Sequence, residues 1–257
     1  MNDYLESLFS LQGKIAVVTG GGRGLGKGMA LGLAGAGAEV ALVSRTEKEL
    51  KETVEDIRAK GGKARAYPAD VSKIDQISSL VQSIYRDKGQ IDILVNNAGF
   101  IIRKMAMDYT KEDWERQLDI NLKAAFFMAQ AVAKIMKVKG GGKIINTLSL
   151  TSFIGLQNAP GYGISRGGLL SMTRTLAMEW AKYRIHVNAI APGYFKTNQT
   201  APLFADEQRV EWMLSRIPLG RAGIPDDLAG VAVFLASPAS DYMTGQAIVV
   251  DGGWLAG

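Results

Sequence analysis

The chain has 257 residues, of which 47% are hydrophobic, so it can bury the core of one large domain. The absence of cysteine excludes disulfides and thiolate metal sites, and no cluster of other ligand side chains predicts a metal site. The net charge is +5 at pH 7, but no dense Lys/Arg run and no aromatic platform among basic residues indicates nucleic acid as a partner.

The N-terminal segment and the hydropathy of the chain indicate where the protein resides. Residues 1–11 include Asp3 and Glu6 and contain no long apolar run, so we expect no signal peptide or mitochondrial presequence. No stretch approaches the roughly 20 apolar residues that a membrane helix needs. We therefore expect a cytoplasmic protein with no membrane partner.

Apolar segments of strand length alternate with amphipathic segments of helix length along the chain. In chain order, the pattern predicts a strand at 14–19, a helix at 24–35, a strand at 39–43, a helix at 47–60, a strand at 63–68, a helix at 74–88, a strand at 91–95, a long helical region at 111–138, a strand at 143–147, a helix at 163–183, a strand at 185–190, a helix at 225–236 and a strand at 247–250. Residues 193–223 are the least regular stretch, and we expect a mobile region near the functional site there.

This alternation predicts an α/β fold. Strands that alternate with helices pair in parallel, with helices on both faces of the sheet. Right-handed crossovers then give a doubly wound parallel seven-stranded sheet of the Rossmann type. Because no repeat, linker or low-complexity tract interrupts the pattern, we expect residues 1–257 to form a single domain.

A glycine-rich turn runs from Thr19 to Gly26, between the first predicted strand and the first predicted helix. Its glycines permit a tight turn and let the backbone approach a pyrophosphate, while the helix N-terminus offers unpaired N–H groups and a positive dipole end. The strand–turn–helix context therefore predicts dinucleotide binding. The candidate ligands in the turn are Gly20, Arg23, Gly24, Leu25 and Gly26.

The end of the second predicted strand bears on the choice between NADP and NAD. Many NAD-binding proteins carry an acidic residue there, which bonds the ribose 2′-hydroxyl. Here Ser44 and Arg45 take that place, and Arg23 adds a second positive charge on the same side. Since a guanidinium attracts a 2′-phosphate, we predict NADP as the cofactor in preference to NAD. Arg45 could instead cap or solvate the following helix.

A set of short motifs in a fixed order resembles the short-chain dehydrogenase/reductase family over essentially the full chain. The motifs are the turn at 19–26, Ala69-Asp70-Val71, Asn96-Asn97-Ala98-Gly99, Asn121, Ser149, Tyr162 and Pro192-Gly193 with Thr197. Several are trivial alone, but their joint occurrence is specific. The resemblance implies one dinucleotide-binding oxidoreductase domain that assembles into a homotetramer.

The resemblance also implies which residues hold the cofactor. Asp70 and Val71 would face the adenine, and Thr197 would hold the nicotinamide carboxamide. The positions implied beyond the glycine-rich turn, Ser44 and Arg45 are Asp70, Val71, Asn97, Ala98, Gly99, Tyr162, Arg166, Pro192, Gly193 and Thr197.

By the same resemblance, three polar residues carry the chemistry. Tyr162 would be the general acid/base, Ser149 would hold the substrate carbonyl or hydroxyl, and Asn121 would fix a water in a proton relay. Hydride transfer to a ketone leaves an alkoxide, which needs a proton from a positioned donor. A free tyrosine has a pKa of about 10, so a nearby cation is needed to make the phenolate accessible.

The chain departs from the family pattern at Arg166, where the family has a lysine four residues after the tyrosine. Positions 162 and 166 lie on one helix face, so Arg166 could still supply charge near Tyr162 and bond the nicotinamide ribose. Its guanidinium is bulkier, planar and permanently protonated, and it cannot pass protons along a water chain as an ammonium can. Arg166 could be tolerated by an active enzyme, could mark a cofactor-binding relative with impaired catalysis, or could be an introduced variant.

Within the family, the chain resembles the enzymes of sugar acids, which include gluconate 5-dehydrogenase and 2-dehydro-3-deoxy-D-gluconate 5-dehydrogenase. The segments that carry this likeness are 9–14, 97–103, 192–197, 200–203 and 250–255. A sugar acid needs a cation for its carboxylate, and Arg103 follows the fourth strand at the edge where ligands bind, although it could be a solvated surface arginine. The remaining candidate substrate contacts are Ser149, Gln157, Tyr162, Tyr194 and Gln199.

Two other functions remain open at this point. The chain could be a 3-oxoacyl reductase or another ketone reductase. It could also bind the cofactor without effective catalysis, because of Arg166. The joint presence of Asn121, Ser149 and Tyr162 argues against this last alternative.

Overall fold

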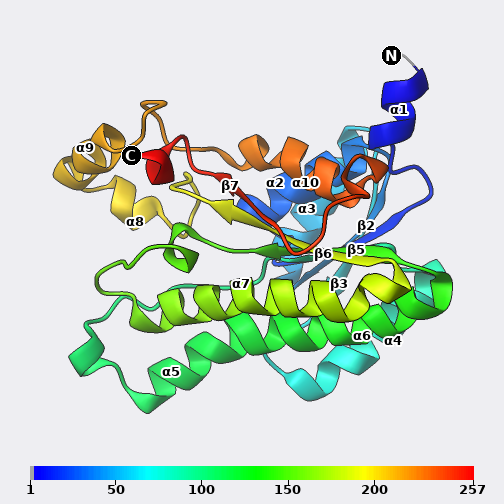
Figure 1. The fold of residues 1–257 in the computed structure, drawn as a ribbon, viewed down its shortest axis with the longest axis horizontal. Helices are drawn as coiled ribbons and strands as arrows, with labels where there is room; N and C mark the ends of the chain where they lie inside the picture. Colours follow the sequence, from blue (N-terminus) through cyan, green and yellow to red (C-terminus); the bar gives the residue numbers. More distant parts are fainter. Residues whose placement is uncertain (1–2) are drawn as a thin grey trace.

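Seven parallel strands form one sheet, in the order β3-β2-β1-β4-β5-β6-β7 (Figure 1). A computed structural model describes residues 3–257 of the chain. The strands are β1 (Ile15–Thr19), β2 (Glu39–Ser44), β3 (Lys63–Pro68), β4 (Ile93–Asn96), β5 (Gly142–Thr147), β6 (Ile185–Pro192) and β7 (Ala247–Val250). The predicted doubly wound parallel sheet is confirmed. The single domain over 1–257 stays a prediction, and its first two residues lie outside the described chain.

Strand β1 lies between β2 and β4 and is buried on both faces. Ala16, Val17 and Val18 are each 0% exposed. Val17 is in register with Ala41 of β2 and Leu94 of β4. A continuous apolar run suits this position, because a parallel strand is covered by helices on both sides.

Helices cover both faces of the sheet (Figure 1). One layer contains α2 (Gly24–Gly35), α3 (Glu47–Ala59) and α10 (Ala229–Ala236), and the other contains α4 (Ile74–Lys88), α5 (Lys111–Leu118), α6 (Ala124–Lys139) and α7 (Pro160–Trp180). Successive residues of β1 face opposite layers, since Val18 shares a core cluster with Leu33 of α2, and Val17 shares another with Met128 of α6. Of the helices described in residues 3–257, none is long and apolar enough to cross a membrane.

The strand order reverses at β1, which has β2 on one side and β4 on the other. In open parallel sheets, ligands bind outside the carboxyl ends of the strands at such a reversal. The segments that follow β1, β2, β4, β5 and β6 therefore form the edge at which the predicted site should lie.

The predicted helical region at 111–138 is interrupted. Helix α5 begins at a capping box, in which the Thr110 side chain accepts from the Asp113 amide at 3.1 Å and the Asp113 side chain accepts from the Thr110 amide at 3.2 Å. A π-helical segment, Asp119–Lys123, separates α5 from α6 and contains Asn121. Short π segments are frequent at functional sites, because they turn a side chain out of the regular helical register.

Two other predicted helices begin or end differently. Helix α7 begins at Pro160, three residues before its predicted start, because proline suits the first helical turn. The predicted last residues form a 3-10 turn, Ala181–Tyr183. The helix predicted at 225–236 likewise begins with a 3-10 turn, Pro225–Leu228, ahead of α10.

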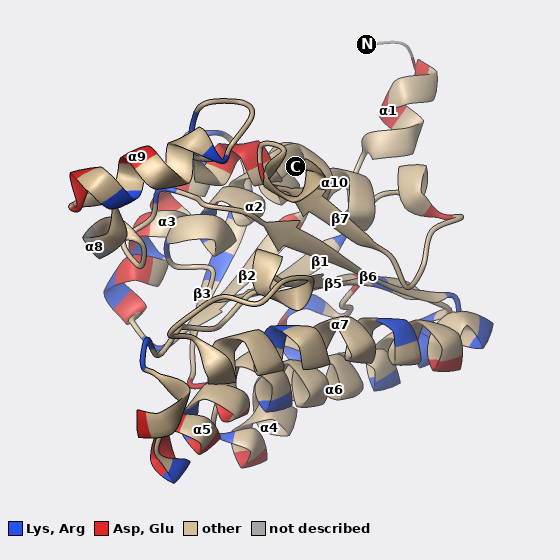
Figure 2. Ribbon diagram, turned by 60° about the vertical axis from the view of Figure 1, so that its left-hand side comes forward, with Lys and Arg blue, Asp and Glu red and all other residues tan. Residues whose placement is uncertain are grey.

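Residues 193–223 were expected to be irregular, but they contain two helices, α8 (Ala201–Phe204) and α9 (Glu207–Ser215). Helix α9 begins where the Asp206 side chain accepts a hydrogen bond of 3.1 Å from the Arg209 amide. It carries acidic and basic residues, in contrast to the strands, which show little charge (Figure 2). A further helix without a sequence prediction, α1 (Asp3–Phe9), buries none of its residues.

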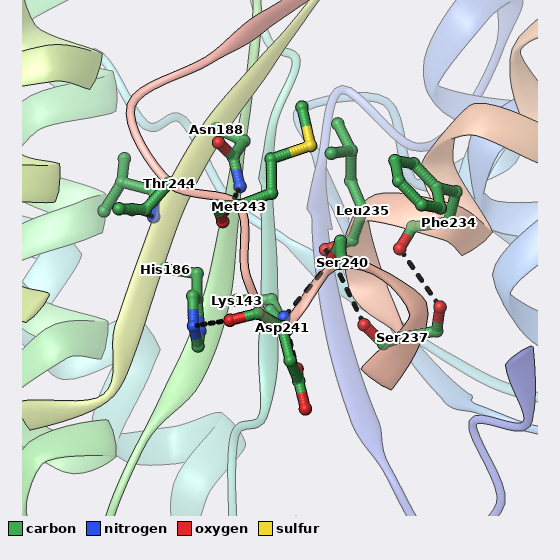
Figure 3. A network of polar contacts seen from close by, with 11 residues as sticks. Lys143, His186, Asn188, Phe234, Leu235, Ser237, Ser240, Asp241, Met243 and Thr244 are labelled. Atoms are coloured by element: carbon green, nitrogen blue, oxygen red, sulfur yellow. Dashed lines mark hydrogen bonds and ion pairs between the residues drawn. The ribbon is translucent and has the colours of Figure 1, made fainter. Parts of the chain in front are cut away.

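A polar network ties β5 and β6 to the segment before β7 (Figure 3). The Lys143 ammonium lies 2.7 Å from an Asp241 carboxylate oxygen and 3.2 Å from the Ser240 hydroxyl. The His186 ring bonds the Asp241 backbone carbonyl at 3.0 Å. Lys143 is only 8% exposed, so these partners compensate the burial of its charge.

Candidate active site

A cleft of about 940 Å³ opens at the carboxyl edge of the sheet, where the strand order reverses. Loops after β1, β2, β3, β4, β5 and β6 contribute to its walls. The predicted site residues that line it are Gly20, Arg23, Gly24, Leu25, Ser44, Arg45, Asp70, Val71, Asn97, Ala98, Gly99, Ser149, Tyr162, Arg166, Pro192, Gly193, Thr197 and Gln199. The tertiary structure thus brings together residues that are up to 179 positions apart, Gly20 and Gln199.

The glycine-rich turn has no room for side chains at its base. Gly20 has a φ of 65°, in the left-handed region that favours glycine. A Cβ on Gly26 would contact the Gly20 carbonyl oxygen and would lie 2.5 Å from the Asn97 side-chain nitrogen. Gly26 therefore lies beneath the turn and not on the cleft wall, where it lets helix α2 approach the strand closely.

The segment that follows strand β4 holds the turn in place through hydrogen bonds to Thr19. The Thr19 hydroxyl oxygen accepts from the amides of Asn97 at 3.0 Å and Ala98 at 3.1 Å. In return, the Asn97 side chain donates to the Thr19 carbonyl at 3.1 Å. The motif after β4 therefore has a structural part in the site, because it fixes the floor of the cleft.

The two predicted arginines near the end of β2 differ in their surroundings. Arg23 lies 2.8 Å from a Glu49 carboxylate oxygen, so its positive charge is already compensated. Arg45 has no ion pair among the described residues 3–257. Glu49 also lines the cleft, and the sequence analysis did not identify it. The positive charge predicted at Arg23 is therefore present, but it is paired with Glu49.

Asp70 is held as a carboxylate at the end of the cleft that contains Arg45. Burial disfavours its charged form, but the hydroxyl and amide of Ser72, which donate to one Asp70 oxygen at 2.7 and 3.0 Å, outweigh this effect. Arg45 and Lys73 add favourable charge, and the pKa of Asp70 is lowered from its ordinary value.

At the other end of the cleft, Arg166 is packed against Tyr162. The guanidinium carbon lies 5.2 Å from the centre of the Tyr162 ring, and Nη1 donates to the Thr147 carbonyl at 2.7 Å. Arg166 is only 5% exposed. A Cβ on Gly99 would lie 2.5 Å from Arg166 Nη2, so glycine at position 99 makes room for the guanidinium.

The side chains of Ser149 and Asn121 differ in their hydrogen bonds and in their exposure to the cleft. The Ser149 hydroxyl accepts a long bond of 3.3 Å from the Thr151 amide and lines the cleft. The Asn121 side chain is 1% exposed, bonds the amide and carbonyl of Phe100 at 3.0 and 2.9 Å, and donates to the Ser165 hydroxyl at 3.2 Å. Its side chain thus anchors the segment after β4 and does not line the cleft. The water in a relay stays a prediction.

Three buried polar atoms in the cleft have no hydrogen-bond partner within the described residues: Ser44 Oγ, Thr147 Oγ1 and Arg166 Nε. Ser44 lies at one end of the cleft and the other two lie at the opposite end. Buried polar atoms normally have partners, so these atoms fit a long polar ligand that reaches both ends. A dinucleotide has this extent and polarity, and the glycine-rich turn leaves space for its phosphates.

Arg103 lies outside the cleft lining, but within electrostatic reach of Tyr162. Burial and the positive charge of Arg209 lower the pKa of Arg103, whereas Tyr194 and Tyr162 act in the opposite direction. Burial raises the pKa of Tyr194, although the positive charges of Arg103, Arg209 and Arg216 act to lower it. Gln157, by contrast, is exposed and does not line the cleft.

Arg209 is a candidate that the sequence analysis missed. It lies one helical turn before Met213 on α9, so both side chains are on one face. Met213 is 0% exposed and packs in a cluster with Leu150, which directly follows Ser149. The spacing of Arg209 and Met213 was a usable signal, but only if helix α9 had been recognised.

The chain is similar to curated oxidoreductases over nearly its whole length. A family model described as "Enoyl-(Acyl carrier protein) reductase" matches residues 20–255. The 2-dehydro-3-deoxy-D-gluconate 5-dehydrogenase of Escherichia coli strain K12 is 51% identical over 251 residues, which are 97% of this chain and 98% of that protein. The gluconate 5-dehydrogenase of Gluconobacter oxydans strain 621H is 41% identical over 246 residues, which are 96% of each chain.

A solved structure shares the fold throughout. It is a gluconate 5-dehydrogenase from Burkholderia cenocepacia J2315 in complex with NADP and tartrate. The TM-score is 0.95 and the identity 37%, and the match covers 98% of this chain and 99% of that one. The two proteins are therefore similar in sequence as well as in fold.

Proposed function

Because the chain belongs to the short-chain dehydrogenase/reductase family, it is an NAD(P)-dependent oxidoreductase that acts on CH–OH groups, and we propose that its substrate is a sugar acid. The reaction interconverts a secondary alcohol and a ketone, as in gluconate 5-dehydrogenase. The observation that carries this proposal is a pair of arginines: Arg103 lies within electrostatic reach of Tyr162, and Arg209 lies within electrostatic reach of Arg103. Neither has an ion pair among residues 3–257, so a substrate carboxylate would supply the missing negative charge.

NADP is the proposed cofactor in preference to NAD. No carboxylate occupies the last position of β2 or the next two positions, where Ser44 and Arg45 line the cleft. The solved Burkholderia relative is in complex with NADP. When bound, the cofactor would supply or accept the hydride. The turn at Gly20 and Gly24 would hold its phosphates, and Thr197 would contact the carboxamide.

The side chains at the end of β5 and the start of α7 carry the proton chemistry in this proposal. Ser149 would hold the substrate oxygen by a hydrogen bond. Tyr162 would remove the hydroxyl proton during oxidation and return it during reduction. Arg166 would place a permanent positive charge beside the Tyr162 ring, 5.2 Å from its centre.

The assembly and location remain part of the proposal. We propose a cytoplasmic homotetramer, as the family resemblance implies. Met178 on α7 is 82% exposed and Val138 on α6 is 86% exposed, and such apolar side chains support contacts between copies. Light scattering of the purified protein would give the number of copies.

The nicotinamide absorbance of the purified protein, assayed with NADP and NAD over a panel of sugar acids, simple ketones and acyl thioesters, tests the proposal. We expect turnover with oxidised or reduced gluconate-type acids and NADP(H). Turnover confined to acyl thioesters would instead identify an acyl reductase. Cofactor binding without turnover on any member of the panel would identify a protein with impaired catalysis at Arg166.

A further inference from the structure

An ion pair stands at the adenosine end of the cleft. Arg23 Nη1 lies 2.8 Å from Glu49 Oε1, and the two side chains are 63% and 26% exposed. Both residues line the cleft, together with Ser44, Arg45 and Thr46. The pair therefore lies where the adenosine ribose of a dinucleotide is expected to bind.

Helix α3 holds Glu49 against the glycine-rich turn. A Cβ on Gly22 would lie 3.1 Å from the Glu49 Cβ, so the turn and the helix are in close contact. One turn along α3, the Thr53 hydroxyl donates to the Gly22 carbonyl at 2.9 Å, and Thr53 is 0% exposed. Glu49 and Thr53 thus share the face that contacts the turn, which places the Glu49 carboxylate within reach of Arg23.

Two further polar side chains lie beside this pair, Ser44 and Thr46. Ser44 Oγ is buried and has no hydrogen-bond partner within residues 3–257. Thr46, the N-cap of α3, makes no side-chain capping bond. These groups can serve a ribose hydroxyl as well as a phosphate. By contrast, a 2′-phosphate brings about −1.5 to −2 charges at neutral pH, by analogy with phosphorylated side chains, and it needs a cation, which Arg23 can supply only in competition with Glu49.

We propose that Glu49 sets the cofactor preference by competing with the 2′-phosphate of NADP(H) for Arg23. Binding of NADP(H) then requires the Arg23–Glu49 pair to open or to accept a second anion beside the carboxylate. NAD(H) carries a hydroxyl at the same position and leaves the pair intact. Glu49 thus weakens the preference for NADP that Ser44 and Arg45 create. This inference rests on the proposed cofactor.

The substitution Glu49→Gln tests the proposal, because glutamine keeps the size of the side chain and removes its charge. The dissociation constants of NADPH and NADH are measured by fluorescence titration of the purified protein at low ionic strength. We expect NADPH to bind about two- to fivefold more tightly and NADH to be unchanged, which is the range of a partly exposed ion pair. Unchanged or weaker NADPH binding would overturn the proposal.

A second measurement asks whether the effect passes through Arg23. In an Arg23→Ala background, Glu49→Gln should no longer tighten NADPH binding. An equal gain in both backgrounds would show a general charge effect and would also overturn the proposal. Glu49→Ala provides a second variant if thermal unfolding shows that Glu49→Gln does not fold.

Glu55 provides a matched control on the same helix. It pairs with Arg58 at 2.9 Å, is exposed and does not line the cleft. Glu55→Gln makes the same change in net charge, but outside the cleft. It should therefore leave the ratio of the NADPH and NADH dissociation constants unchanged. If the wild-type protein bound neither cofactor, the proposed function itself would fail. Binding of both cofactors without a Glu49 effect would refute only the present inference.

Discussion

Arg166 Nη1 donates a 2.7 Å hydrogen bond to the backbone carbonyl of Thr147, at the end of strand β5. This bond fixes the guanidinium against the Tyr162 ring, with its carbon 5.2 Å from the ring centre. Arg166 Nε is also buried and has no hydrogen-bond partner within residues 3–257. The bond to Thr147 therefore holds the charge of Arg166 beside Tyr162, while Nε remains without a partner.

We predict that Arg166→Lys raises kcat for a sugar-acid substrate by at least about tenfold, which corresponds to ~1.4 kcal/mol of barrier. A lysine ammonium can pass protons to water, which a guanidinium cannot do at ordinary pH. The same substitution should lower the thermal unfolding temperature, because the bond to Thr147 is lost. Steady-state kinetics at several pH values measure the effect. An unchanged or reduced kcat would show that the site is adapted to arginine.

We predict that Arg103→Ala and Arg209→Ala each raise KM for the sugar acid by about tenfold, with a smaller effect on kcat. Both arginines would contact the carboxylate, which lies away from the reacting carbon. The control is Arg58→Ala, since Arg58 forms an exposed ion pair on α3. If neither Arg103→Ala nor Arg209→Ala changed KM while the control behaved as wild type, the carboxylate role would be wrong.

We predict that Gly26→Ala destabilises the protein by about 1–3 kcal/mol and abolishes NADPH binding. The added Cβ would contact the Gly20 carbonyl and displace the turn that is proposed to hold the phosphates. Gly35→Ala is the matched control in the same helix, because a Cβ there meets no atom within 4 Å. Chemical denaturation and NADPH titration of both variants measure the difference. Equal stability and equal binding would contradict a role for close packing at Gly26.

We predict that His186 makes the protein less stable as the pH falls below about 6.5, which is the ordinary pKa of a histidine side chain. Burial, and then the charge of Lys143, lower the pKa of His186 in the folded chain. As the pH falls, His186 therefore takes up a proton in the unfolded chain before it does so in the folded chain. The stability that neutral His186 contributes to the folded chain is fully present above about pH 6.5 and is lost as the pH falls toward the lower folded pKa.

The measurement compares denaturant midpoints at about pH 7.5 and about pH 5.5 for the wild type and His186→Gln. Glutamine can still donate to the Asp241 carbonyl, which His186 bonds at 3.0 Å. The wild type should lose more stability between the two pH values than the variant. Equal losses would assign the pH dependence to other groups.

Much of the fold could be read from local pattern. The β-branched run at Ile15–Thr19, followed by glycines and a helix, has few structural alternatives, because strand and helix periods differ and glycine marks the turn. The helix at Gly24–Gly35 and the strand at Lys63–Pro68 have the predicted bounds. Short helices were harder, since α9 has only 9 residues and one fully buried side chain, Met213.

The sequence by itself determined the order of strands and helices, the glycine-rich turn and the residue types at Ser149, Tyr162 and Arg166. These follow from spacing along one chain. The tertiary structure alone decided which charges are free. Glu49 pairs with Arg23 across 26 positions, and Arg209 approaches Arg103 from a distant helix. Electrostatic interactions depend on distance in space, and sequence separation does not give that distance.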